Sequence, residues 1–230
     1  MEGMNFDLRQ QTVRELNGFL HSAEGKAKRG TIAVHHPDGA HNIAAGLNAP
    51  LKVMVHGHAG YYAAGMNMHA DITIEGSAGT GVAENMMSGR VHVKGFASNS
   101  AGASAHGGLL VIDGNAALRC GISLKGGDIV VGGSVGSFSA FMAQAGRMVV
   151  CGDAGDGLGD SLYEAVLYVK GSIKSLGADA QIEPMGEADL KAVTDLLAQA
   201  GYSEHKAADF KRVASKRELY HWNADANQEY

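Results

Sequence analysis

A glycine recurs every 19 residues through the middle of this chain. Seven positions keep the spacing without a slip: Gly57, Gly76, Gly95, Gly114, Gly133, Gly152 and Gly171. Glycine is abundant here, at 33 of 230 residues, yet chance alone would place seven in register with odds on the order of one in a million. A fixed period of this length is typical of a repeat fold, in which each unit stacks on the next.

Apolar residues alternate just before each repeat glycine. The residue two positions earlier is Val or Ile, and the residue four positions earlier is Val, Ile, Leu or Met. This alternation predicts a strand with one buried face. In the six coils from Gly57 to Gly152, positions three, seven and thirteen after the glycine hold only Gly, Ala or Ser, and we expect these small residues and the glycines to turn the chain. A helical repeat is disfavoured, because so many glycines would break each helix.

The repeat therefore predicts an all-β solenoid, a right-handed parallel β-helix of about seven coils. The three prolines, Pro37, Pro50 and Pro184, lie outside it, as expected if every coil uses its backbone N–H groups in a ladder. We assign 1–50 to an N-terminal arm with a short helix and a first irregular coil, 51–183 to the β-helix, and 184–230 to a C-terminal helical cap or docking arm.

Both ends carry signals of their own. Residues 6–8 suggest a strand, and Thr12 with Glu15 predicts a capping box that opens a short helix. Residues 30–38, in which Ile32 and Val34 alternate, indicate an additional coil two residues out of register.

At the other end we predict two helices. Leu190, Val193, Leu196 and Leu197 fit one helical face, which Gly201 ends, and Phe210 with Val213 suggests the second helix.

Composition argues against several classes of function. A net charge of -5 gives no general attraction to nucleic acid or to an anionic membrane. Residues 129–146 carry no charge, but their four Gly and three Ser make a membrane span unfavourable. Two Cys cannot form a disulfide framework. No secretory signal is visible at the start, so we expect a reducing cytoplasm.

No metal, cofactor or catalytic residue is assigned from the sequence. The repeat places His35 near His56, which supplies two ligands at best, in an outward column that looks solvated. Cys120 falls in an inward column and is expected to be a core thiol, whereas Cys151 faces outward. Residues 152–160 are acidic and Gly-rich, yet they match neither a calcium repeat nor a phosphate loop, so we expect a corner loop.

The C-terminal segment has basic and aromatic residues that suit a docking arm. Its candidate partner-docking residues are Arg212, Arg217, Tyr220 and Trp222. Such a run can also bind nucleic acid, but the segment 181–230 is net acidic, with nine Asp or Glu against six Lys or Arg. Docking on a partner protein is therefore favoured, and packing on the last coil is the alternative.

Written as G-x-x-G-x-x-x-G units, as in Gly152, Gly155 and Gly159, the chain resembles the GXGXG-domain family. That family includes the C-terminal β-helix domain of the glutamate synthase large subunit and the β-helix subunit of formylmethanofuran dehydrogenase. The resemblance covers nearly the whole chain, and it is greatest to the middle, glutamate-synthase-like subunit of N-methylglutamate synthase.

The resemblance implies a non-catalytic structural subunit of a hetero-oligomer. The implied partners are a class II amidotransferase-like subunit and an FMN-binding, glutamate-synthase-like subunit, and the implied reaction makes N-methylglutamate from glutamate and methylamine. FMN, with an iron–sulfur cluster as a further candidate, would lie in a partner. Two alternatives stay open: the formylmethanofuran dehydrogenase subunit, and an independent β-helix protein that acts on carbohydrate.

Overall fold

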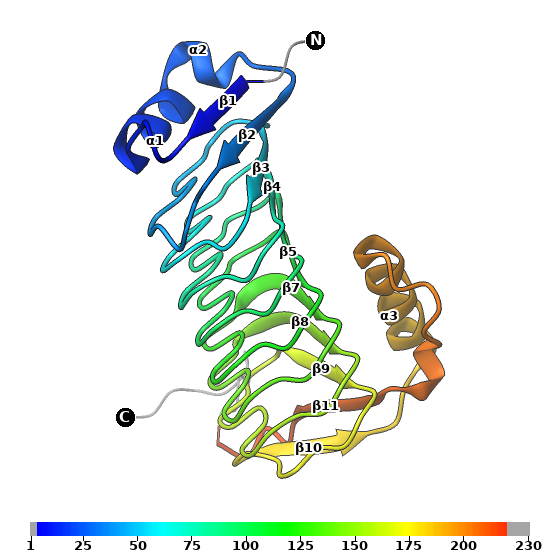
Figure 1. Ribbon diagram of the computed structural model, residues 1–230. Coiled ribbons are helices and arrows are strands. Elements are labelled where there is room, and N and C mark those ends of the chain that lie inside the picture. The colour runs from blue at the N-terminus through cyan, green and yellow to red at the C-terminus, as the bar shows by residue number, and fades with distance from the viewer. Residues whose placement is uncertain (1–3, 220–230) are drawn as a thin grey trace, which may run out of the picture.

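Strands stack side by side along the whole length of the molecule (Figure 1). The computed structural model describes residues 4–219, and there it forms one 11-stranded sheet in the order β1-β2-β3-β4-β5-β6-β7-β8-β9-β11-β10. The strands are β1 Met4–Asp7, β2 Thr31–His35, β3 Lys52–His56, β4 Asp71–Ile74, β5 Arg90–Val93, β6 Leu109–Ile112, β7 Lys125–Val131, β8 Ala145–Val150, β9 Val166–Val169, β10 Ala180–Glu183 and β11 Lys211–Ser215. The helices are α1 Val13–His21, α2 Ala23–Lys26, α3 Glu187–Ala200 and the 3-10 turn η1 Ala207–Asp209.

The register confirms the parallel β-solenoid. From β3 to β9 each strand pairs in parallel with the next at the expected offset, so that Val55 lies beside Ile74. Strands β2 and β3 pair Val34 with Val55, an offset of 21 residues, which confirms the first coil and its shifted register. The inward residues two before each glycine are fully buried, and they fill the interior of the rod.

A second, shorter ladder follows each glycine. Single parallel bridges join the residues two positions after the glycine in successive coils: Ala59, Ala78, Ala97, Ala116, Val135, Ala154 and Ile173. This column was not singled out from the sequence. Its small or branched side chains, buried except for the partly buried Ile173, close a second side of the coils.

The repeat glycines are needed for close approach rather than for turning the chain. The N–H of Gly76 donates to the carbonyl of Gly57 at 3.0 Å, and a Cβ on Gly76 would lie 2.6 Å from that carbonyl carbon. Among the seven repeat glycines, only Gly57 has a left-handed φ. The turn instead uses positions five, seven and nine after the glycine, such as Tyr62, Ala64 and Met66 with φ of 57°, 55° and 54°. This corrects the expected role of the repeat glycines.

The N-terminal end is covered as the sequence predicts. Strand β1 extends the sheet beyond β2, and the capping box of α1 is confirmed, because Glu15 N–H donates to Thr12 Oγ1 at 3.2 Å and Thr12 N–H donates to Glu15 Oε2 at 2.6 Å. Leu16 and Leu20 of α1 are buried. They close the apolar interior of the first coil.

Helix α3 lies against the side of the rod (Figure 1). Its predicted face is confirmed for Val193, Leu196 and Leu197, which are buried, while Leu190 is partly buried, and the helix ends at Gly201 with φ 92°. These side chains pack against outward residues of four strands, namely Val111, Val130, Val149 and Tyr168. The sheet face here is apolar on both sides, so it needs a cover.

The predicted second C-terminal helix is wrong. Lys211–Ser215 form β11, which pairs antiparallel with both β9 and β10, and only the short turn η1 precedes it. The last parallel strand would otherwise expose a row of unpaired backbone groups. An extended segment satisfies them, so the end of the rod is covered by a strand pair and not by the expected helical cap.

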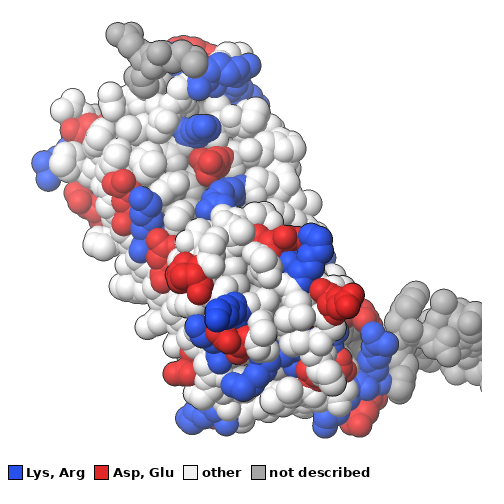
Figure 2. Space-filling view, turned by 90° about the vertical axis from the view of Figure 1, so that its right-hand side faces the viewer, with Lys and Arg blue, Asp and Glu red and all other residues white. Residues whose placement is uncertain are grey.

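The described part of the chain contains no helix long and apolar enough to cross a membrane. On the side that carries α3, basic and acidic side chains are interspersed (Figure 2). Outward positions of adjacent strands pair opposite charges, with Lys52, Asp71 and Arg90 in register, an arrangement that favours the sheet.

Candidate functional site

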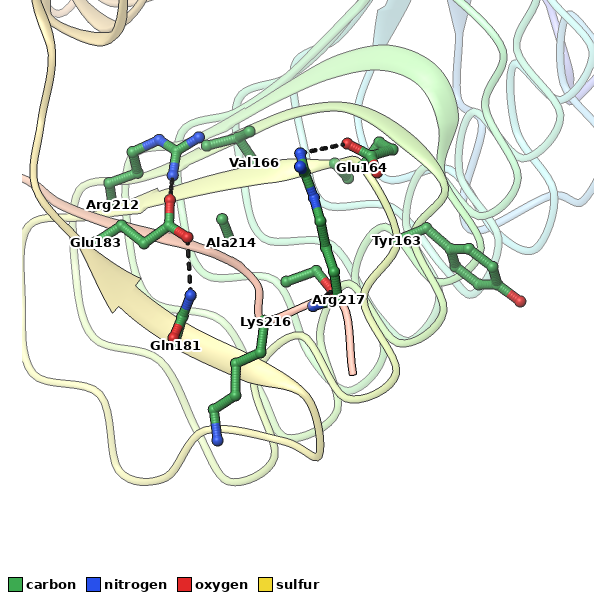
Figure 3. A pocket seen from close by; sticks show the side chains of 11 residues that line it. Tyr163, Glu164, Val166, Gln181, Glu183, Arg212, Ala214, Lys216 and Arg217 are labelled. Atoms are coloured by element: carbon green, nitrogen blue, oxygen red, sulfur yellow. Dashed lines mark hydrogen bonds and ion pairs between the residues drawn. The ribbon is translucent and has the colours of Figure 1, made fainter. Parts of the chain in front are cut away.

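A cavity of about 250 Å³ opens where β9, β10 and β11 meet at the C-terminal end (Figure 3). Its charged lining is mixed: Glu164 and Glu183 are acidic, and Arg212, Lys216 and Arg217 are basic. The remaining lining residues are Tyr163, Ala165, Val166, Gln181, Ala214 and Ser215. The structure thus brings together two of the four predicted docking residues, Arg212 and Arg217.

Arg212 links three elements of the C-terminal segment. Its guanidinium forms an ion pair with Glu183 of β10, and its Nε donates to Asp189 Oδ1 of α3 at 3.1 Å. The hydroxyl of Tyr168 on β9 donates to the same carboxylate oxygen at 2.7 Å. The Arg212 side chain is 20 % exposed. Its charge is therefore used inside the chain, where it holds α3 and β10 to β11.

Asp189 is ionised and Tyr168 is neutral at neutral pH. Burial opposes ionisation of Asp189, but hydrogen bonds from Tyr168, from the Gly186 N–H and from Arg212 outweigh it, so the pKa of Asp189 lies below its ordinary value. Burial and the bond to Asp189 raise the pKa of Tyr168 above its ordinary value. Neither group can exchange a proton readily near pH 7.

Arg217 is the more accessible of the two docking candidates. Its side chain is 67 % exposed and contacts Glu164 at 3.1 Å. Partner docking by Arg212 and Arg217 stays a prediction. Tyr220 and Trp222 lie outside the described residues.

The histidines of the first coils stack as predicted. The rings of His35 and His56 lie 4.7 Å apart at 9°. Nδ1 of His56 is 2.8 Å from Glu75 Oε2, and Nε2 of His35 is 3.1 Å from Asn5 Oδ1. Among residues 4–219 no group of three or more His, Cys, Asp or Glu could hold a metal ion.

The two thiols differ in burial, and Cys151 is less exposed than its outward column suggested. Cys120 is fully buried, which confirms its place in the core, and burial raises its pKa to about 12. Cys151 is only partly exposed, because the C-terminal segment around Tyr202 packs over this column. Burial raises the pKa of Cys151 to about 11 although Lys170 lowers it. Its surroundings are therefore not the solvated ones expected.

The acidic loop at 152–160 joins successive coils. Asp153 Oδ1 accepts the N–H of Ser172 at 2.7 Å, and Asp160 Oδ2 accepts the N–H of Ala178 at 3.1 Å. Both carboxylates therefore bond the backbone of the next coil, which is the structural role expected for a corner loop.

The bond from Ser172 to Asp153 is the last step of a side-chain ladder that sequence reasoning missed. In the column one after the glycine, His58, Ser77, Asn115, Ser134 and Asp153 each accept the N–H of the corresponding residue in the next coil. The sequence did contain a signal for this ladder, because these five side chains, at the same position of the repeat, all carry an acceptor atom.

Comparison with known proteins finds a relative that matches nearly the whole chain. No protein-family model matches the chain. A curated protein named Protein GlxC, from Rhizobium meliloti (strain 1021), is 50 % identical over 224 residues, which is 97 % of this chain and 98 % of that protein. Because half of the aligned residues are identical over nearly the full length of both chains, the chain belongs to the family of Protein GlxC.

Proposed function

We propose that this chain is a non-catalytic structural subunit of a glutamate-synthase-like complex, and specifically of an N-methylglutamate synthase. The proposal rests on the resemblance of its glycine repeat to GXGXG domains. It is consistent with the solenoid, which stacks each repeat glycine from Gly76 onwards directly on the glycine of the previous coil. In this role the chain holds an amidotransferase-like subunit and an FMN-binding, synthase-like subunit together.

The single observation that carries the scaffold role is the continuity of the sheet. Parallel pairing runs from β1 to β9, and neighbouring strands lie about 4.8 Å apart. The eight strands from β2 to β9 therefore span roughly 34 Å. Because backbone lies on backbone along the glycine column, the rod resists bending, and it suits the task of fixing two partners at a set distance.

The charged groups of the described residues favour the same role. In the cavity, Arg212 and Glu183 neutralise each other, and so do Arg217 and Glu164. The thiols of Cys120 and Cys151 have raised pKa values, which disfavours the thiolate form that a nucleophile requires. We therefore assign the chemistry to the partners, with FMN bound there and an iron–sulfur cluster as a further candidate.

The test is purification of the tagged chain at its natural expression level. We expect stoichiometric recovery of an amidotransferase-like chain and a synthase-like chain, with flavin absorbance and methylamine-dependent formation of N-methylglutamate. Recovery of the chain alone and colourless, from cells that contain both partners, would refute the scaffold role. Cleavage of a polysaccharide by the purified chain would favour the carbohydrate alternative instead.

A further inference from the structure

A diagonal row of exposed apolar side chains crosses three successive coils. Phe96, Leu118 and Phe138 are 58 %, 50 % and 45 % exposed, and each belongs to the coil after the previous one. We call these three residues, with Arg119 and Phe141, the diagonal strip. Large apolar residues exposed together mark interaction surfaces more often than scattered ones do.

The strip lines three adjoining hollows. One, of about 370 Å³, lies beside Phe96, and the next, of about 440 Å³, is lined by Leu118, Arg119 and Phe138. The first hollow includes Gly79 and Ser98 and the second includes Thr80 and Asn99, so the two meet along neighbouring residues. A third hollow, of about 140 Å³, lies between Arg119, Phe138 and Phe141. Together they form a shallow groove that runs obliquely across the coils.

The fold does not require the aromatic ring at the head of the strip. Phe96 occupies the column in which Ser77, Asn115 and Ser134 accept a hydrogen bond from the next coil. The phenyl ring has no acceptor for the N–H of Asn115, so the side-chain ladder is interrupted there. Phe96 therefore costs the rod a ladder bond, and the residue stays 58 % exposed.

Arg119 adds an unused positive charge. It is exposed, and none of the ion pairs among residues 4–219 includes it. By contrast, Arg147 pairs with Asp128, and Arg212 pairs with two carboxylates. The residues that line the three hollows include no Asp or Glu. The groove therefore combines apolar rings with one cation that has no ion-pair partner among residues 4–219, and a carboxylate brought by a partner would complement it.

We infer that the diagonal strip docks a partner subunit that presents apolar side chains around a carboxylate, which pairs with Arg119. The inference rests on the proposed scaffold function. A second copy of this chain fits less well, because a two-fold contact through the strip would bring the two Arg119 side chains together with no carboxylate between them.

The test compares strip variants with a matched control in the assembled complex. Leu118→Ser and Arg119→Glu change exposed residues of the strip, and Met87→Ser changes an apolar residue that is 44 % exposed but lines none of its hollows. We expect each strip variant to lower the recovery of one identified partner at least about tenfold, with an unchanged melting temperature of the isolated chain. Met87→Ser should assemble as the original chain does.

A photo-crosslinking residue at position 118 identifies the occupant. We expect a cross-link to a partner peptide that contains Asp or Glu, and reversal of that carboxylate to Lys should restore assembly with Arg119→Glu. A cross-link to a second copy, or to residues 220–230 of the same chain, would overturn the inference, as would normal assembly of both strip variants. If the original chain itself assembles with no partner, the proposed function fails first.

Discussion

The glycine column makes a strong prediction about a single added methyl group. Gly76→Ala places a Cβ 2.6 Å from both the carbonyl carbon and the carbonyl oxygen of Gly57. The optimal separation of non-bonded heavy atoms begins at about 3.5 Å, so the methyl group lies about 1 Å too close. The obstructing atoms are backbone, and a rotamer change cannot move them.

The clash between the added methyl group and the Gly57 carbonyl can be relieved only if the two coils separate at this corner. Overpacking of this kind costs about 1–3 kcal/mol. The hydrogen bond from Gly76 N–H to the Gly57 carbonyl, 3.0 Å long, is also lost, at about 1 kcal/mol. We therefore expect Gly76→Ala to lower the free energy of unfolding by about 2–4 kcal/mol.

Chemical denaturation followed by far-ultraviolet circular dichroism measures this loss. The matched control is Gly18→Ala in helix α1, where nothing lies within 4 Å of the added Cβ. That substitution should raise stability by up to about 1 kcal/mol, because Ala is the better helix former. If Gly76→Ala unfolds within about 0.5 kcal/mol of the original chain, close backbone stacking is not the reason for the glycine repeat.

Three further predictions concern the core, the C-terminal segment and the thiols. Val131→Asp buries an unpaired charge in a fully buried inward position and should abolish soluble, folded protein; normal folding and complex assembly of this variant would show that the column assignment is wrong. Because the pKa of Asp189 is lowered in the folded chain, its stabilisation is complete above its ordinary pKa of 3.8 and is lost as the pH falls below that value. Hydrogen exchange of α3 should therefore accelerate in acid, and Arg212→Gln should raise the pH at which this happens. Identical acid profiles of the two proteins would show that the contact between Arg212 and Asp189 does not hold α3 in place. Cys120 should resist a thiol reagent at pH 8 until the chain unfolds, and Cys151 should react slowly but first; fast native labelling of Cys120 would contradict its burial.

The repeat explains why so much of the fold was predictable. The alternation of Ile32 and Val34 indicated the shifted first coil, whose offset is 21 residues, and so the stacking of His35 on His56 was expected before its confirmation at 4.7 Å. From β3 to β9 the register follows from the period by addition of 19 residues. The same addition placed Cys120 inside the rod. Local signals sufficed for the helix that Thr12 caps. Each of these features depends on neighbours in sequence or on neighbours one period away.

The C-terminal segment was less predictable because it follows no period. Lys211–Ser215 are extended because β9 and β10 offer partners, and nothing within the segment itself indicates these strands. The Arg212 cluster combines residues from β9, β10, β11 and α3, so its geometry depends on that docking. One signal was available: the outward column that begins with Met54, Thr73 and His92 becomes apolar from Val111 through Val130 and Val149, which predicts a cover there without naming the segment that supplies it.

In a solenoid of this kind, residues of the type that recurs at a given repeat position stabilise the stacking of the coils. Residues of a different type at the same position are therefore the candidates for specific recognition. The apolar outward residues around Val130 are such a departure, and α3 accounts for them by burying them. Phe96 is another, since it replaces a ladder acceptor with an exposed ring. Among residues 4–219 no segment of the chain buries Phe96 or neutralises Arg119. A surface that costs the rod a ladder bond and exposes an aromatic ring beside an unpaired cation is what the proposed scaffold role requires, because a rod in that role must offer a partner a surface to dock on.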